Sequence, residues 1–546
     1  MKSIPLVGAD GIDNALSFAA LIGCTTALLI AVNPHWYGDA TWYAIAIHSG
    51  ELLPLDAGHL LWRPVGAFAV SVATLFSFSL DPLLALQIIS AFSTVLSSIF
   101  LYEIAIALQL KAAPAIPVAY LLSHFSLVYG GSGSSYSTSV MFHLLAVKWC
   151  LQSEATSKAR TIVFCGIASA LSLSFWGLGI LGIPLLMAIP FVSWKNSIQT
   201  KFMYSMAIPF SAMSLFGATL IIGFLTTESN TTFANFFVWL RSSGHGIPAE
   251  LSLLNLLRAP LGLIQSVLYL GDLGTALKSF ISGGGNQYGP VLPIVLLVSF
   301  FLYFGGVFIL QWNGIVSSKL FLLFIASLAP SFLFGALWQG SDIERFCFVL
   351  PYFLLLLADL SARSFLKGYL SVIPAIAFCL WNFTSIAVTY EQDHEELITE
   401  IAKQTTLSAP PKSIFVVTGQ DFGPRIWAPL HYLTGHTFYS LLYDSQVEGV
   451  AGWQNRLEQT IKQHLEAGGK PYVLDSLYSV KPESPKPTLT EADNHPSEGD
   501  IAMFFHHSNG GQKIVAKRYH FRELAYRDSR NRQQDNSNKR TFDINE

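Results

Sequence analysis

Charge is scarce in this sequence and unevenly placed. Only 12% of the 546 residues are charged, against roughly 25% in soluble globular proteins, and 52% are hydrophobic. The first 390 residues carry 29 charges, whereas the last 156 carry 38. These values exclude a soluble single-domain enzyme and a disordered protein. They indicate a polytopic α-helical membrane protein with a soluble C-terminal domain.

Several other features are missing. The net charge of −3 lacks the basic excess that phosphate backbones require, which argues against nucleic acid as a partner. The five cysteines lie inside apolar runs without metal-ligand spacing, so we interpret them as packing residues. The glycine-rich runs at 130–139 and 283–285 have no lysine, which excludes a phosphate-binding loop of the nucleotide-binding kind.

Long apolar runs are abundant in the first 390 residues. A membrane-spanning helix needs roughly 20 apolar residues. The sequence predicts about eleven transmembrane helices, near residues 14–33, 84–109, 113–129, 139–152, 161–175, 178–193, 203–225, 291–312, 320–338, 346–362 and 368–390. For a further apolar run at 64–79, the periodicity does not show whether the segment crosses the membrane.

Charge placement predicts that the run at 64–79 does not cross. With that assignment and a cytoplasmic N-terminus, ten of the fifteen basic residues in the first 390 lie on the cytoplasmic side, as the positive-inside rule requires. The five outer ones are Arg63, Arg241, Arg258, Lys278 and Arg345. Segments 34–83 and 226–290 then form outer loops of the membrane domain (1–390), and the C-terminal domain also lies outside.

The C-terminal part resembles a small α/β domain over residues 391–526. Residues 413–418, 471–477, 501–505 and 513–517 are predicted strands, and 453–467 a helix ending at two glycines. Residues 481–500 are predicted as a loop, and 527–546 as a disordered tail.

Two outer stretches concentrate candidate functional residues. The first follows the initial span and contains Asp39, Tyr43, His59 and Arg63 among aromatic residues. The carboxylate of Asp39 is a candidate functional group, although acids beyond a span are also ordinary solvated residues. Aromatic residues at this level are ordinary interface anchors.

The second stretch is Asp342-Ile343-Glu344-Arg345-Phe346. Arg345 lies on the outer side, against the positive-inside bias, and a guanidinium matches the phosphate oxygens of a lipid headgroup. The alternative is a snorkelling arginine paired with Glu344 or Asp342. Within spans, Glu103, His124 and His143 are ionisable candidates that we interpret mainly as water-accessible or packing residues.

This layout resembles the GT-C superfamily of lipid-sugar-dependent glycosyltransferases, including protein O-mannosyltransferase-like and aminoarabinose-transferase-like enzymes. Asp39 matches the Asp of the family's Asp-Glu-x-x-Tyr element and Tyr43 its Tyr, whereas Ala40 replaces the Glu. His59 matches the histidine of a His-Pro-Pro element whose prolines are absent here. The run at 64–79 resembles the family's juxtamembrane helix, and Glu344-Arg345-Phe346 its late Arg-Tyr element.

The resemblance implies an inverting transferase of the bacterial inner membrane. Its donor would be a sugar on a polyprenyl phosphate, and its acceptor a hydroxyl of a glycan, lipid or protein on the outer face. Asp39 would be the catalytic base, and substrate would contact Tyr43, His59, Arg63, Glu344 and Arg345. No cofactor or metal is expected. The alternatives are a transporter or flippase for a lipid-linked saccharide, and a non-catalytic envelope assembly protein.

Overall fold

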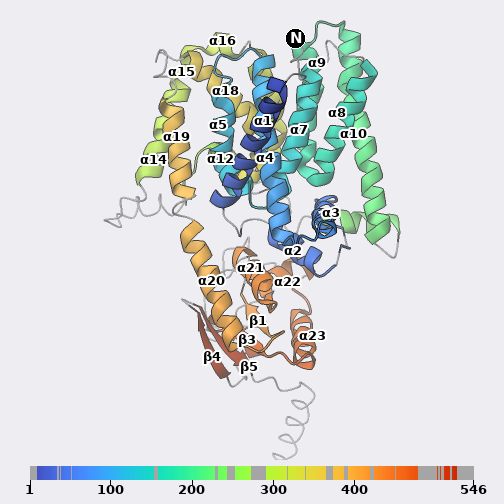
Figure 1. Ribbon diagram of the computed structural model, residues 1–546, viewed down its shortest axis with the longest axis vertical. Helices are drawn as coiled ribbons and strands as arrows, with labels where there is room; N and C mark the ends of the chain where they lie inside the picture. Colours follow the sequence, from blue (N-terminus) through green and yellow to red (C-terminus); the bar gives the residue numbers. More distant parts are fainter. Residues whose placement is uncertain are drawn as a thin grey trace, which may run out of the picture. The chain divides into compact units, whose positions relative to one another are not determined.

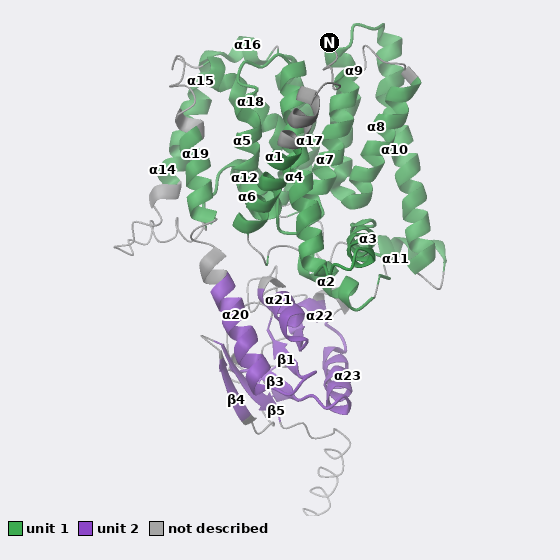
Figure 2. Cartoon of the chain, viewed as in Figure 1, with its two compact units in different colours: residues 1–393 green, residues 394–546 purple. Residues whose placement is uncertain are grey.

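A computed structural model forms two compact units, Met1–Asp393 and His394–Glu546 (Figure 2). It describes residues 9–477 and 501–524 apart from 34–35, 37–38, 51, 54, 153–157, 228–230, 243–252, 272–290, 317, 339, 364–372, 387–390, 419–423, 449, 502–503, 506–509 and 517–518. The predicted loop at 481–500 and the predicted tail at 527–546 lie outside the described residues.

Unit 1 is built from helices that run roughly along one another (Figure 1). Among the residues that the structure describes, three helices are long and apolar enough to cross a membrane: α4 (Pro82–Ala107), α10 (Ile198–Thr227) and α17 (Lys319–Leu337). The others that fall on predicted spans are α1 (Ala9–Val32), α7 (Tyr136–Gln152), α8 (Lys158–Phe175), α14 (Val291–Phe300), α15 (Gly306–Leu310), α18 (Leu350–Arg363) and α19 (Ile373–Phe383).

Two predicted spans are interrupted rather than continuous. The run at 113–129 divides into α5 (Ala115–Leu121) and α6 (His124–Tyr129), because the Ser123 hydroxyl accepts a hydrogen bond from the Ser126 amide and starts a new helix. The run at 178–193 begins as a 3₁₀ helix, η2 (Gly177–Gly182), before α9 (Ile183–Ser193). The helices therefore form where predicted, but the sequence does not show these breaks.

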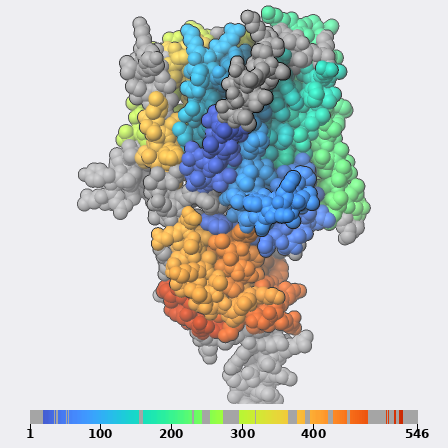
Figure 3. All heavy atoms as spheres, viewed as in Figure 1, coloured from blue at the N-terminus to red at the C-terminus, as the bar shows by residue number. Residues whose placement is uncertain are grey.

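The ambiguous run at 64–79 becomes α3 (Trp62–Leu75), a short surface helix (Figure 3). Its 14 residues measure about 21 Å along the axis, less than the roughly 30 Å hydrocarbon core of a bilayer. Phe68 and Leu75 are exposed along it. This length agrees with a helix that does not cross. The predicted outer loop 226–290 also contains helices, α11 (Phe233–Ser242) and α12 (Leu253–Val267).

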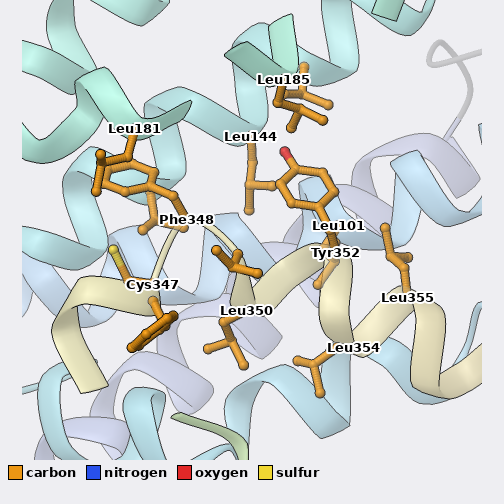
Figure 4. Packing of buried hydrophobic residues seen from close by; sticks show 14 of the residues in the cluster. Leu101, Leu144, Leu181, Leu185, Cys347, Phe348, Leu350, Tyr352, Leu354 and Leu355 are labelled. Carbon is orange, nitrogen blue, oxygen red and sulfur yellow. The ribbon is translucent and has the colours of Figure 1, made fainter. Parts of the chain in front are cut away.

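The core of unit 1 forms around α18. Figure 4 shows Phe348, Leu350 and Tyr352 packed among leucines of neighbouring helices, including Leu144 and Leu185. The segment that precedes α18 is the 3₁₀ helix η4 (Ile343–Phe346), which is also buried. Because η4 packs against both α12 and α17, its charged residues are held in fixed positions.

The ionisable residues inside helices have partners. Glu103 forms an ion pair with Lys148, and Asp359 with Arg363 at 2.9 Å. The His143 ring meets the Tyr352 hydroxyl at 3.0 Å, and His124 meets the Gln265 carbonyl. These contacts agree with the interpretation of both histidines as packing residues.

Unit 2 has a five-stranded sheet in the order β2-β1-β3-β5-β4. The strands are β1 (Ile414–Val417), β2 (Thr437–Ser440), β3 (Pro471–Leu474), β4 (Gly510–Ala516) and β5 (Tyr519–Leu524). The pairs β1–β2 and β1–β3 are parallel, while β5 is antiparallel to β3 and β4. Its helices are α20 (Glu391–Ser408), α21 (Pro424–Thr434), α22 (Leu441–Glu448) and α23 (Trp453–Glu466).

One predicted strand is wrong. The described residues of the run 501–505, namely Ile501, Phe504 and Phe505, are helical. Ile501 and Phe505 are both buried, and their spacing of four is the period of a helix face. The run is apolar throughout, so it lacks the alternation that separates strand from helix.

Candidate functional site

Five segments of unit 1 come together at the candidate site; three of them are consecutive in the chain, and the other two are distant from these in sequence. They are the start of α2 (Ala40–His48), the loop that follows it, the start of α3, the start of α7, and η4. Every predicted site residue lies on one of them. The contacts below bring all of these segments into one network.

Asp39 is the residue immediately before α2. Its side chain does not cap the helix. Instead, Asp39 Oδ2 accepts a 2.9 Å hydrogen bond from the hydroxyl of Tyr136 at the start of α7. The carboxylate is only half-buried. It therefore combines a fixed orientation with access to a second partner, as a general base requires.

A glycine turn before α7 allows this approach. Gly133 has a φ of +87°, and a Cβ there would lie 3.1 Å from Ala40 Cβ. The Trp62 indole of α3 donates a 3.0 Å hydrogen bond to the Gly133 carbonyl. The glycine- and serine-rich run, which has no phosphate-loop lysine, thus serves to bring the starts of α2, α3 and α7 together.

Tyr43 organises the loop after α2. Its hydroxyl donates a 3.1 Å hydrogen bond to Asp56 Oδ2, while Asp56 Oδ1 accepts one from the Gly58 amide at 2.8 Å. The Arg63 guanidinium carbon lies 5.5 Å from the centre of the Tyr43 ring. Burial raises the pKa of the Tyr43 hydroxyl, and the charges of Asp56 and Asp39 raise it further. Tyr43 is therefore a neutral donor that holds Asp56 in place.

His59 fastens this loop to two helices. Its Nδ1 is 2.7 Å from Ser135 Oγ and 3.2 Å from the Phe175 carbonyl. The ring packs between Tyr43 and Tyr136, with centroids 5.6 Å and 6.0 Å away. These contacts give His59 a positioning role, and its predicted contact with substrate stays a prediction.

Arg345 and Glu344 form a buried ion pair on η4, each with 9% of its surface exposed. Arg345 Nη1 is 2.8 Å from Glu344 Oε1, and Nη2 is 3.5 Å from Asp342 Oδ2. The guanidinium also lies 5.1 Å from the Trp338 ring centre. Arg345 therefore does have the acidic partners considered above, and it is rigidly held rather than snorkelling in solvent.

Tyr136 connects the two halves of the site. Its hydroxyl donates to Asp39, and burial and the nearby charge of Glu344 raise the pKa of that hydroxyl. Burial raises the pKa of Glu344, and Asp342 and Asp39 raise it further, whereas Arg345 and Tyr136 lower it. The structure thus brings Asp39 and Tyr136 close to the ion pair of Glu344 and Arg345. No sequence motif singled out Tyr136 or Asp56.

A metal site of three clustered His, Cys, Asp or Glu side chains is absent from the part of the chain that the structure describes. The expectation that the protein needs no metal or cofactor stays a prediction.

Comparison with known proteins finds structural likeness but no sequence relative. No family model and no curated protein matches the sequence. The structure of ArnT from Cupriavidus metallidurans bound to undecaprenyl phosphate is similar with a TM-score of 0.52, at 12% identity over 93% of this chain and 98% of that one.

Two further solved structures are more distant. One is the oligosaccharyltransferase AglB of Archaeoglobus fulgidus with an inhibitory peptide and a dolichol-phosphate (TM-score 0.41, 16% identity, 91% and 72% covered). The other is the arabinofuranosyltransferase AftD from Mycobacteria (TM-score 0.39, 14% identity, 94% and 40% covered). The likeness to ArnT extends over nearly the whole of both chains, so this chain shares the fold of that structure.

Proposed function

We propose that this chain is an integral-membrane glycosyltransferase that moves a sugar from a polyprenyl phosphate to an acceptor hydroxyl. The reaction takes place at the outer face of the membrane, which we infer to be a bacterial inner membrane with the N-terminus cytoplasmic. Asp39 is the base, and the transfer inverts the anomeric centre.

The observation that carries the proposal is that Asp39, which accepts a hydrogen bond from Tyr136, lies close enough to Glu344 to raise the pKa of that carboxyl, while Glu344 pairs with Arg345. A transferase with a lipid-phosphate donor needs a base for the acceptor and a cation for the leaving group, close together. Asp39 and Arg345 supply these two groups. They are distant in sequence, and the fold brings them to one place.

The chemistry follows from the two ends of the network. Asp39 takes the proton of the acceptor hydroxyl as its oxygen attacks the anomeric carbon, a contribution of about 10²–10⁴-fold. The bond from that carbon to the phosphate oxygen breaks at the same time. Arg345 stabilises the charge that develops on the phosphate, which is a weak base and needs no general acid. One displacement inverts the stereochemistry.

The donor class rests on the fold and on the arginine. ArnT, whose fold this chain shares, is solved with undecaprenyl phosphate. Arg345 combines burial, a fixed orientation and an aromatic neighbour at Trp338, which together suit a phosphate group at the membrane level.

The test is an Asp39→Asn variant expressed in a strain that lacks the native gene. Asparagine keeps the shape of the side chain but cannot accept the proton. Mass spectrometry of envelope glycans and lipid-linked sugars should show loss of the sugar from the glycans and accumulation of its polyprenyl-phosphate donor. We expect transfer to fall at least about 100-fold.

The matched control is Asp81→Asn. Asp81 lies in the same outer segment and caps α4 by accepting a 3.0 Å hydrogen bond from the Leu84 amide, and asparagine caps helices equally well. This variant should restore the glycans to the wild-type level. A folded Asp39→Asn protein that restored them equally would contradict the proposal.

A further inference from the structure

The guanidinium that is assigned to the donor phosphate already carries two acidic partners. Arg345 contacts Glu344 at 2.8 Å and Asp342 at 3.5 Å. One cation is thus shared by two carboxyl groups before any substrate binds. A phosphate anion would add a third acidic group around the same charge, in a site whose arginine and glutamate are each about nine-tenths buried. Uncompensated buried charge is costly, so one acidic group must lose its charge or leave.

Glu344 is the group best placed to lose its charge. It is more buried than Asp342, whose side chain is 27% exposed against 11% for Glu344. Burial favours the neutral carboxylic acid. Asp342 also accepts a hydrogen bond from the Glu344 amide, so one of its oxygens already has a donor.

A partner for neutral Glu344 is already in place. A phenol has one hydrogen, and Tyr136 donates it to Asp39 at 2.9 Å. The Tyr136 oxygen can then accept a hydrogen bond, and a protonated Glu344 can donate one to it. A neutral Glu344 that leaves the guanidinium can therefore donate to the Tyr136 oxygen, whose pKa the Glu344 charge already raises.

We propose that Glu344 holds the place of the donor phosphate on Arg345, and that donor binding is accompanied by the uptake of one proton by Glu344. This inference rests on the proposed function, because it assumes that Arg345 binds the phosphate of a polyprenyl donor. The proton comes from water. It returns to water when the lipid phosphate leaves and Glu344 pairs with Arg345 again, so no net proton is consumed by the exchange.

The groups that face Glu344 agree with this assignment. Arg345 favours its charged form, as does Tyr136 of α7 to a smaller extent, whereas Asp342 on η4 and Asp39 before α2 disfavour it. The helices α12 and α17 pack against η4 as well, but their charged residues Arg258 and Lys319 are not among the principal influences on its pKa. A phosphate on Arg345 offsets the largest influence that keeps Glu344 ionised.

The experiment measures binding of undecaprenyl phosphate to the full-length protein in detergent as a function of pH, with tryptophan fluorescence as the signal. For wild type, affinity should fall as pH rises above the Glu344 pKa of about 8, approaching about tenfold per pH unit where one proton is taken up. Glu344→Gln supplies a permanently neutral side chain. Its affinity should be higher at alkaline pH, and its slope should be reduced to that of the lipid phosphate itself.

Equal slopes in wild type and Glu344→Gln would overturn the inference and leave the proposed donor intact. Absence of undecaprenyl phosphate binding at every pH would contradict the proposed donor and the inference with it. A second measurement needs no variant: above the Glu344 pKa of about 8, a pH-indicator dye in weakly buffered solution should report close to one proton taken up per lipid bound. Binding without proton uptake would also overturn the inference.

Discussion

At the scale of single residues, the site is a set of polar groups with defined partners. Asp39 and Arg345 could be predicted, because each is a charge in an unusual place: an acid just past a span, and an outer arginine against the positive-inside bias. Tyr136 could not be predicted, because a tyrosine after a serine-rich run carries no signature. Its importance comes only from tertiary contacts with Asp39 and Glu344.

His59→Ala should destabilise unit 1. The change removes the contacts of Nδ1 with Ser135 Oγ and the Phe175 carbonyl, and it leaves a buried hydroxyl with one partner fewer. A loss of about 1–3 kcal/mol is expected, measured as lower thermal stability in detergent. His48→Ala, at an exposed position at the end of α2, is the control. Equal stability of the two variants would show that His59 does not fasten the loop.

Glu344 should make stability depend on pH. Its pKa is raised in the folded protein by burial, so the folded state binds more protons than the unfolded state between the two pKa values. Stability is therefore greatest at low pH and falls as pH rises from the usual carboxyl range to the raised pKa. Thermal unfolding at a series of pH values should show this slope in wild type and a smaller one in Glu344→Gln. If Glu344→Gln showed the same slope as wild type, the pH dependence of stability would come from other groups.

At the scale of elements, periodicity located most helices but not their interruptions. The boundary between α5 and α6 depends on the Ser123 cap, which is one serine among many in the sequence. For residues 501–505 the prediction was wrong in the type of element and not in its boundaries. The predicted strand is helical at Ile501 and Phe505, because a short run that is apolar throughout fits either structure and the surroundings decide.

Gly133→Ala should disturb the junction of α2, α3 and α7. The new Cβ would have a positive φ and would lie 3.1 Å from Ala40 and 3.3 Å from the Gln87 amide. Gly50→Ala is the matched control, since Gly50 has a φ of +74° and nothing within 4 Å of the added atom. Both variants carry the strain of about 1–2 kcal/mol of a left-handed residue. Only Gly133→Ala should also lower transfer, because it displaces the residue next to Asp39.

If Gly50→Ala and Gly133→Ala lost the same stability and kept the same activity, close packing at the turn would not position Asp39. Thermal unfolding and mass spectrometry of the glycan product together separate the two effects.

At the scale of the whole molecule, the sequence predicted the fold class because charge is tied to topology in membrane proteins. Few charges in the first 390 residues, with their basic members biased to one side, indicated spans and a surface segment at 64–79. The short helix α3 and the likeness to ArnT agree with that architecture. Charge placement could not settle the number of crossings. The ends of short helices such as α5, α6 and α9 depend on the helices packed around them, which the sequence does not show.

The central claim is that Arg345 binds the lipid phosphate, and the Arg345→Ala variant tests it. A charge-assisted hydrogen bond contributes about 1.5–3 kcal/mol, so its loss should weaken binding by about 10- to 100-fold. Arg363→Ala is the control at the far end of α18, because it removes an arginine whose ion pair with Asp359 is largely a surface contact.

The decisive measurement is the dissociation constant of undecaprenyl phosphate for wild type, Arg345→Ala, Arg363→Ala and Asp39→Asn at one pH. The account predicts that Arg345→Ala alone binds about 10- to 100-fold more weakly, while Asp39→Asn binds well but transfers no sugar. Wild-type affinity in the Arg345→Ala protein would contradict it.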